Sequence, residues 1–275
     1  MKQGPVITIR PPRAFGDISV RELWRFRGFL LSMTRRRLLT EFDDQYLAIL
    51  WAIGRPLLMV AVFALLRNFS AAEMGVHIPY PLYVYSGLVL WFFFAEALNQ
   101  TATSIKQNAA LIQKVYFPRI LAPLSTILAE LAILSISAIP LVLLLIYYGE
   151  PPSWRIILLP LVLLQITLLL FGAGCLFASL GLMSSDWDKF LSFALYVGLF
   201  VSPVIYSPQI LPSNVLWIYS LNPLVGPLLA FRSVLIDAFP WPTWEFYYSA
   251  AFSILLAITG LLAFQRAERT LSERI

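Results

Sequence analysis

Three ionisable residues fall inside apolar stretches of the sequence, where charged side chains are rare. Arg55, Glu96 and Glu130 each lie about 7–10 residues inside a stretch long enough to cross a bilayer, which is roughly 10–15 Å along a helix. Charges at this depth usually pair with each other or face an aqueous cavity. We therefore expect Arg55 to pair with Glu96 or with Glu130. A proton relay is the alternative interpretation, but a relay would favour carboxylates without a matching arginine.

The sequence offers little for catalysis of its own. None of the 13 glycines is followed by lysine, so the chain has no phosphate-binding loop of the P-loop type. His77 is the only histidine and Cys175 the only cysteine, which provides no metal-binding cluster and no intramolecular disulfide. We find no Ser-His-Asp set and no paired carboxylates. We therefore expect neither catalytic nor metal-binding residues, and transport against a gradient would need energy from another chain or from an ion gradient.

The surrounding sequence has the composition of an integral membrane protein. Of its 275 residues, 59% are hydrophobic and 13% are charged, whereas soluble domains average roughly 45–50% and 25%. A helix needs about 20 mostly apolar residues to cross a bilayer. Six stretches meet this need, at 46–66, 80–103, 120–148, 156–183, 190–206 and 246–264. The sequence therefore predicts an all-α membrane protein whose transmembrane domain, residues 46–264, has six spans.

The basic residues predict the orientation of these spans. Sixteen of the 20 Lys and Arg residues precede the first span, lie between spans two and three or four and five, or follow the last span. An excess of positive charge marks the cytoplasmic side of a membrane protein, so both termini, including the tail 265–275, are expected to be cytoplasmic. The charges stay close to the spans and form no separate basic domain, which argues against nucleic-acid binding.

Residues 1–45 differ in character from the rest. Apolar residues such as Leu23 and Trp24 alternate with arginines in a helical rhythm, which is typical of an amphipathic helix at the membrane interface. Such a helix could anchor the chain to lipid, dock a cytoplasmic partner, or do both. The first fifteen residues contain no apolar core, so we expect no cleavable signal peptide.

The region 202–240, which begins in the last residues of the fifth span, is apolar but rich in proline. Pro203, Pro208, Pro212 and Pro223 prevent one straight helix. Irregular backbone at membrane depth is tolerated only where protein buries it or where it lines a water-filled path. This region is therefore predicted to form part of a pore or a gate.

Three motifs, in this order along the chain, resemble those of type-2 ABC exporter permeases. They are Leu47-Ala48-Ile49-Leu50-Trp51 with Pro56 after it, the loop Leu111-Ile112-Gln113-Lys114-Val115-Tyr116-Phe117-Pro118-Arg119, and Ser202-Pro203-Val204-Ile205-Tyr206 followed by Asn222-Pro223-Leu224. The resemblance covers essentially the whole chain. It is strongest to the branch that exports lipid-linked polysaccharides such as O-antigens, with capsule and teichoic-acid exporters as near relatives. Two departures are Ala48, where the family usually has Gly, and 184–189, which lacks the family's frequent Arg-Asp pair.

The resemblance implies a multi-pass homodimer in the bacterial cytoplasmic (inner) membrane that works in O-antigen export and lipopolysaccharide biosynthesis. Two cytoplasmic ABC ATPase subunits would bind ATP and magnesium, so this chain itself would be no enzyme and would hold no cofactor. The ATPases would contact Leu111, Lys114, Tyr116, Phe117, Pro118, Arg119, Trp24 and Arg25. Re-entrant helices between spans five and six would form an external gate that contains Pro203, Tyr206, Pro208, Pro212, Trp217, Asn222 and Pro223. Sugar rings would slide through a channel between the two copies, lined by aromatic residues, for which the candidates are Trp91, Phe94, Tyr196 and Tyr206.

Other functions share parts of this pattern. A type-2 ABC permease for drugs or small hydrophobic molecules would have the same fold without a sugar-compatible channel. An ion-coupled secondary transporter would show broken helices in both halves of the chain, and here only one half contains them. A membrane-embedded enzyme such as a glycosyltransferase would need a cluster of catalytic acids and bases, which the sequence lacks.

Overall fold

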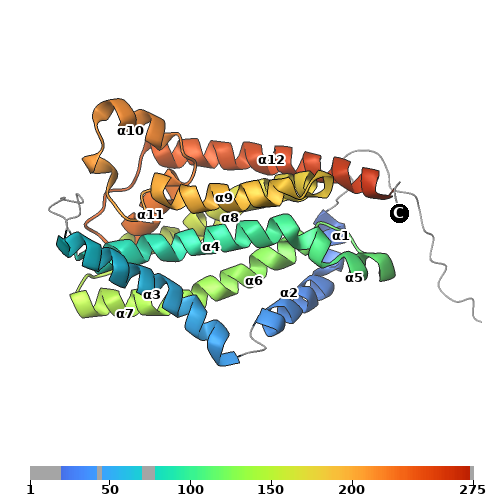
Figure 1. Ribbon diagram of the computed structural model, residues 1–275, viewed down its shortest axis with the longest axis horizontal. Helices are drawn as coiled ribbons and strands as arrows, with labels where there is room; N and C mark the ends of the chain where they lie inside the picture. Colours follow the sequence, from blue (N-terminus) through green and yellow to red (C-terminus); the bar gives the residue numbers. More distant parts are fainter. Residues whose placement is uncertain (1–19, 42–44, 70–77, 273–275) are drawn as a thin grey trace, which may run out of the picture.

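The computed structural model describes residues 20–41, 45–69 and 78–272, which form helices and turns with no strand among them (Figure 1). The expectations for His77 and for the chain ends 1–19 and 273–275 fall outside these residues. The helices are α1 Val20–Arg25, α2 Arg27–Glu41, α3 Gln45–Phe69, α4 Tyr80–Gln107, α5 Ala109–Lys114, α6 Leu121–Ser137, α7 Ile139–Tyr148, η1 Trp154–Leu158, α8 Leu159–Met183, α9 Asp186–Val201, η2 Pro208–Ile210, α10 Ser213–Ser220, α11 Val225–Leu235 and α12 Trp244–Ser272.

Helix α4 runs through the centre of the bundle. It packs against α3, α6 and α8, and side chains such as Leu82, Val84 and Tyr85 are fully buried. Pro81 lies in its first turn, where the missing N–H costs no helical hydrogen bond. The Tyr85 hydroxyl donates to the carbonyl oxygen of Ser137 at the end of α6, over 3.0 Å. The central position of α4 means that its polar side chains are held at fixed places between the other helices.

Helices α8 and α12 form the most extensive helix pair. A Cβ atom on Gly260 would clash with the carbonyl oxygen of Gly172, and a Cβ on Gly172 would clash with the backbone of Leu256. Gly174, on another part of α8, similarly leaves room for the side chain of Thr101 on α4. Small residues let membrane helices approach closely and pack by van der Waals contact. Glycines therefore fix α8 against both of its main neighbours.

Among the residues that the structure describes, four helical stretches are long and apolar enough to cross a membrane: Tyr80–Lys114, Leu121–Tyr148, Trp154–Met183 and Trp244–Glu268. A fifth is obtained if the pair Asn214–Ser220 and Val225–Leu235, bent by 89°, counts as one broken span. Helix α3 contains a shorter apolar stretch, Leu50–Leu66, and α9 has 16 residues. The predicted all-helical membrane architecture is thus confirmed, and the number of six spans stays a prediction.

Among the differences between predicted spans and observed helices, one span is divided and another ends early. The third is divided into α6 and α7, with Pro140 in the first turn of α7. The fifth ends at Val201 and not at residue 206, because Ser202 is extended (φ −100°, ψ 156°) ahead of Pro203. A residue before proline is driven out of the helical region by a clash with the proline ring.

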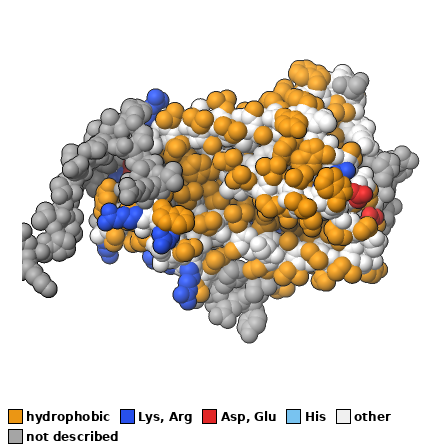
Figure 2. All heavy atoms as spheres, turned by 180° about the vertical axis from the view of Figure 1, so that it is seen from behind, with side chains coloured by type: hydrophobic (Ala, Val, Ile, Leu, Met, Phe, Trp, Pro, Cys, Tyr) orange, Lys and Arg blue, Asp and Glu red, His pale blue; other side chains and the backbone are white. Residues whose placement is uncertain are grey.

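Charged and apolar side chains are separated along the bundle. In Figure 2, hydrophobic side chains cover the middle, and most Lys and Arg side chains gather toward one end. Figure 1 shows that this end carries α2, α5 and the C-terminal part of α12. Arg35 and Arg36 of α2 and Lys114 of α5 are exposed there.

Candidate functional site

The three charges singled out within apolar stretches of the sequence belong to two different ion pairs. Arg55 of α3 lies 3.6 Å from Glu96 of α4, and both side chains are partly exposed. The Arg55 guanidinium also lies over the ring of Phe92, 4.6 Å from its centroid. Glu130 of α6, only 2% exposed, lies 3.9 Å from Arg37 of α2. Sequence reasoning had placed Arg37 among the cytoplasmic arginines and missed that it faces a buried carboxylate.

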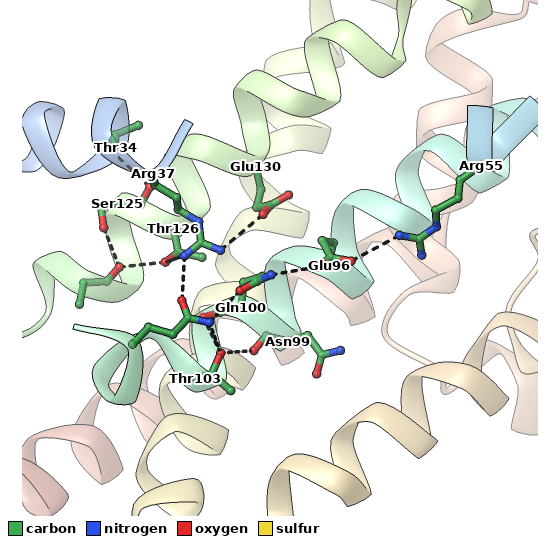
Figure 3. A network of polar contacts seen from close by, with 12 residues as sticks. Thr34, Arg37, Arg55, Glu96, Asn99, Gln100, Thr103, Ser125, Thr126 and Glu130 are labelled. Atoms are coloured by element: carbon green, nitrogen blue, oxygen red, sulfur yellow. Dashed lines mark hydrogen bonds and ion pairs between the residues drawn. The ribbon is translucent and has the colours of Figure 1, made fainter. Parts of the chain in front are cut away.

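A polar stripe on α4 connects these two ion pairs (Figure 3). Its members Glu96, Gln100, Thr103 and Gln107 recur at helical spacing on one side of α4. Gln100 donates to Glu96 over 3.1 Å, and Gln107 donates to Gln100 over 2.9 Å and to Thr103 over 3.0 Å. Arg37 donates to Gln107 over 3.1 Å and so joins the stripe to α2. The spacing of these residues was visible in the sequence, where attention to ionisable groups alone overlooked the amides.

A cavity opens beside the charged end of this stripe, between α3, α4 and α6. Its volume is about 300 Å³. The wall combines the charges of Arg55, Glu96 and Glu130 with apolar side chains that include Trp51 and Phe93. Hydroxyl, amide and carboxylate groups held in an otherwise apolar bundle can hydrogen-bond water or a polyhydroxylated molecule. Glu96 belongs to both, so the polar stripe ends at a cavity whose wall is mainly apolar.

The candidate ATPase-contacting residues divide into exposed and buried ones. Tyr116 is 85% exposed, and Lys114, Trp24 and Arg25 are also exposed, while Leu111 and Pro118 are partly buried. Phe117, in contrast, is buried in a cluster with Met33, Ile120 and Phe264. Its ring lies 4.8 Å from that of Phe29 on α2.

Arg119 also contacts another helix of the same chain. Its Nε lies 3.6 Å from a carboxylate oxygen of Glu268 on α12, and its Nη1 donates to the Glu268 carbonyl oxygen over 3.3 Å. The loop 115–119 is therefore fastened at its C-terminal part to α2 and α12. Its N-terminal part, Val115 and Tyr116, projects outward.

The candidate gate segment leaves α9 as an irregular turn and returns as η2, α10 and α11. The Asn222 side-chain amide donates to the Ser202 hydroxyl over 3.0 Å, and its carbonyl oxygen accepts from the Leu224 N–H over 3.0 Å. These bonds connect the start of the segment to the α10–α11 bend. Of the predicted gate residues, Pro203 is buried, Tyr206, Pro208, Asn222 and Pro223 are partly buried, and Pro212 and Trp217 are exposed.

A buried arginine that sequence reasoning did not single out also holds this segment. Arg232 of α11 donates to the carbonyl oxygens of Pro203 and Val204. The sequence shows Arg232 only as one of the few arginines outside the predicted cytoplasmic regions. No pattern in the sequence connects it to Pro203 and Val204, some 30 positions earlier. The Tyr83 hydroxyl of α4 adds a bond of 2.7 Å to the Tyr206 carbonyl oxygen.

The four candidate channel aromatics lie in unlike places. Trp91 and Phe94 are buried inside the bundle, where the Trp91 ring occupies the space beside Gly198 of α9. Tyr196 of α9 is 70% exposed. The Tyr206 hydroxyl donates to the Phe200 carbonyl oxygen over 2.9 Å. Of the four side chains, Tyr196 is therefore the most exposed, and Tyr206 is partly buried.

Comparison with known proteins identifies the family. Residues 29–236 match the family described as ABC-2 type transporter. The O-antigen export system permease protein RfbA of Klebsiella pneumoniae is 26% identical, over 89% of this chain and 93% of its own length. The protein of the same name from Myxococcus xanthus is 29% identical, over 79% and 84%, and the polysialic acid transport protein KpsM of Escherichia coli is 26% identical, over 86% and 92%. This multi-pass membrane protein therefore belongs to the ABC-2 type transporter family.

Proposed function

We propose that the chain is the membrane subunit of an ATP-driven exporter that moves a lipid-linked, O-antigen-like polysaccharide across the cytoplasmic membrane. The observation that carries this proposal is the likeness, over at least 79% of the chain, to permeases named for O-antigen export. The polar stripe Glu96–Gln107 supports it, because a hydrated sugar chain needs a wet path through the hydrocarbon layer.

The proposal includes six spans, with α3 and α9 as the first and fifth, and a channel between two copies. Both helices present large apolar side chains on the outside, including Leu58 of α3 and Phe193 and Tyr196 of α9. In a homodimer some of this surface would meet the second copy and some would line the channel. We assign the end that carries α2, α5 and most basic side chains to the cytoplasm, following the positive-inside rule.

Two ATPase subunits would engage the cytoplasmic end. Tyr116 and Lys114 project outward and are the proposed contacts. Phe117 and Arg119 would transmit the movement, because they join the same loop to α2 and α12. Rigid helices can carry such a shift to a distant element that has two arrangements, here the segment from Ser202 to Leu235.

A capsule polymer is the second candidate substrate. The likeness to KpsM, a polysialic acid transport protein, favours it. A teichoic acid would use the same kind of path. An ion-coupled transporter is a weaker alternative, because family membership points to an ATPase partner.

Co-purification with the candidate ATPase would test the function. We expect the chain to elute with an ABC ATPase encoded near it, and lipid-linked glycan to stimulate ATP hydrolysis by that complex. Glycosyltransferase genes beside this one would agree with the proposal. Stimulation by small hydrophobic drugs and not by lipid-linked glycan would contradict it and favour a drug permease.

A further inference from the structure

Arg232 is enclosed by two parts of the chain that are far apart in sequence. Its side chain is 1% exposed. On one side it donates to the Pro203 and Val204 carbonyl oxygens, the latter over 2.8 Å. On the other side it donates to α4, where Nε lies 3.2 Å from the Ser86 hydroxyl and Nη1 lies 2.9 Å from the Tyr83 hydroxyl. One guanidinium thus bonds both α4 and the turn after α9.

No carboxylate of the described part of the chain pairs with the charge of this arginine. None of the ion pairs between described residues includes Arg232. A buried cation is unfavourable unless hydrogen bonds satisfy it, and the five fixed donors of a guanidinium suit a cage of carbonyl and hydroxyl oxygens. A cage of neutral groups can open without separating an ion pair. This arrangement suits a contact that must form and release.

The turn after α9 needs these donors because its own N–H groups do not supply hydrogen bonds to the carbonyl oxygens of Pro203 and Val204. Pro203 has no N–H, and the Val204 N–H donates locally to the Ser202 carbonyl oxygen over 2.7 Å. The carbonyl oxygens of Pro203 and Val204 lie beyond the end of α9. Buried carbonyl groups require hydrogen-bond donors. Arg232 supplies them from α11, and α11 packs on α4.

The surface of α4 is shaped to receive the turn. A Cβ atom on Gly87 would clash with Arg232 Nη2 and would lie 2.8 Å from the Val204 carbonyl oxygen. The Tyr83 ring lies under the guanidinium, 3.7 Å from centroid to Cζ. Glycine at position 87 therefore provides the space in which arginine and turn meet.

We propose that Arg232 is a positioning residue that latches the turn 202–206 onto α4 and sets how often the turn leaves it. The consequence for export rests on the proposed function, in which this turn belongs to the gate. The latch itself does not, since it is a property of this chain's own contacts. The test of the latch can therefore fail while the proposed transport function stands. Equally, the latch can be supported by its test while the transport function is refuted.

Cysteine labelling tests the latch in the full-length chain. In a C175S background, which removes the only native thiol, V204C places a reporter on the turn at a buried position. V162C, at a buried position in α8, is the matched control. Membranes are permeabilised so that a water-soluble maleimide reaches both faces, and the labelling rate is measured with and without R232Q.

R232Q should raise the labelling rate at position 204 by about tenfold or more, because several hydrogen bonds to a charged donor are lost. S86A, which removes one of these bonds, should raise it by about threefold. The rate at position 162 should stay unchanged in both variants. An unchanged rate at position 204 would overturn the proposal. Equal increases at both positions would overturn it too, because they would show that Arg232 supports the whole bundle and not the turn.

Discussion

At the residue scale, the most consequential contact is that between Arg37 and Glu130. Glu130 is buried in α6, and Arg37 reaches it from α2 while also donating to Thr126 over 3.4 Å and to Gln107. A buried carboxylate in an apolar bundle is costly without a nearby cation. The pair thereby ties α2 to α6, on which it packs.

R37Q should therefore lower the stability of the protein markedly. We expect a loss of roughly 3 kcal/mol, because the cation beside a buried carboxylate disappears. The double variant R37Q/E130Q should recover much of that loss, since the buried charge is removed as well. Thermal unfolding in detergent measures both effects. R36Q, at the exposed neighbouring position, is the control and should change little.

A double variant no more stable than R37Q would contradict this interpretation of the contact. It would mean that the destabilisation comes from lost packing or from the bond to Gln107, and not from the buried charge. The long stem of arginine also packs on its neighbours, so this distinction needs the double variant and not the single one alone.

At the scale of elements, the glycines of α8 and α12 determine how closely these helices approach. G260A should destabilise the bundle by about 1–3 kcal/mol, the usual cost of forcing extra atoms into a packed interior. G54A is the matched control, because nothing lies within 4 Å of a Cβ at Gly54. It should be neutral or slightly stabilising, since alanine favours a helix over glycine. Thermal unfolding of both variants measures the difference. Equal stabilities of G260A and G54A would contradict the role of Gly260 in the close approach of α8 and α12.

The loop between α5 and α6 should separate partner binding from folding. Y116A should reduce co-purification of the ATPase and leave the melting temperature unchanged, because this side chain is 85% exposed. F117A should lower the free energy of unfolding by about 3–5 kcal/mol, the usual cost of truncating a buried phenylalanine. Normal ATPase binding by Y116A would contradict the proposed contact between Tyr116 and the ATPase. An unchanged melting temperature for F117A would contradict its place in the packed cluster.

The elements were predictable to the extent that hydrophobic length defines them. Apolar runs located α4, α8 and α12, and the prolines of 202–240 indicated an irregular segment, but the predicted fifth span ran past the end of α9 at Val201. The division between α6 and α7 was missed, because a long apolar run hides a local break. The roles of Phe117 and Arg119 were also hidden, since their partners Phe29 and Glu268 lie 88 and 149 residues away along the chain.

At the scale of the whole molecule, one helical bundle carries the polar stripe of α4, the loop 115–119 and the turn 202–206. The stripe runs beside α3 and α2, the loop lies at the basic end, and the turn lies at the opposite end (Figure 1). Composition predicted the membrane class, and three short motifs predicted the family. The contacts of Arg37 and Arg232 could not be predicted, because helix packing alone decides which side chains from distant segments meet.

Under the proposed function, this chain forms the path for a lipid-linked polysaccharide. Purified permease and ATPase, reconstituted into vesicles with the lipid-linked glycan, test it most directly through the ATP-dependent appearance of glycan on the far side. We predict transfer that requires ATP and is reduced by Y116A. Transfer that proceeds equally without ATP would contradict the proposed function. So would the absence of transfer by a complex that still hydrolyses ATP in response to another substrate.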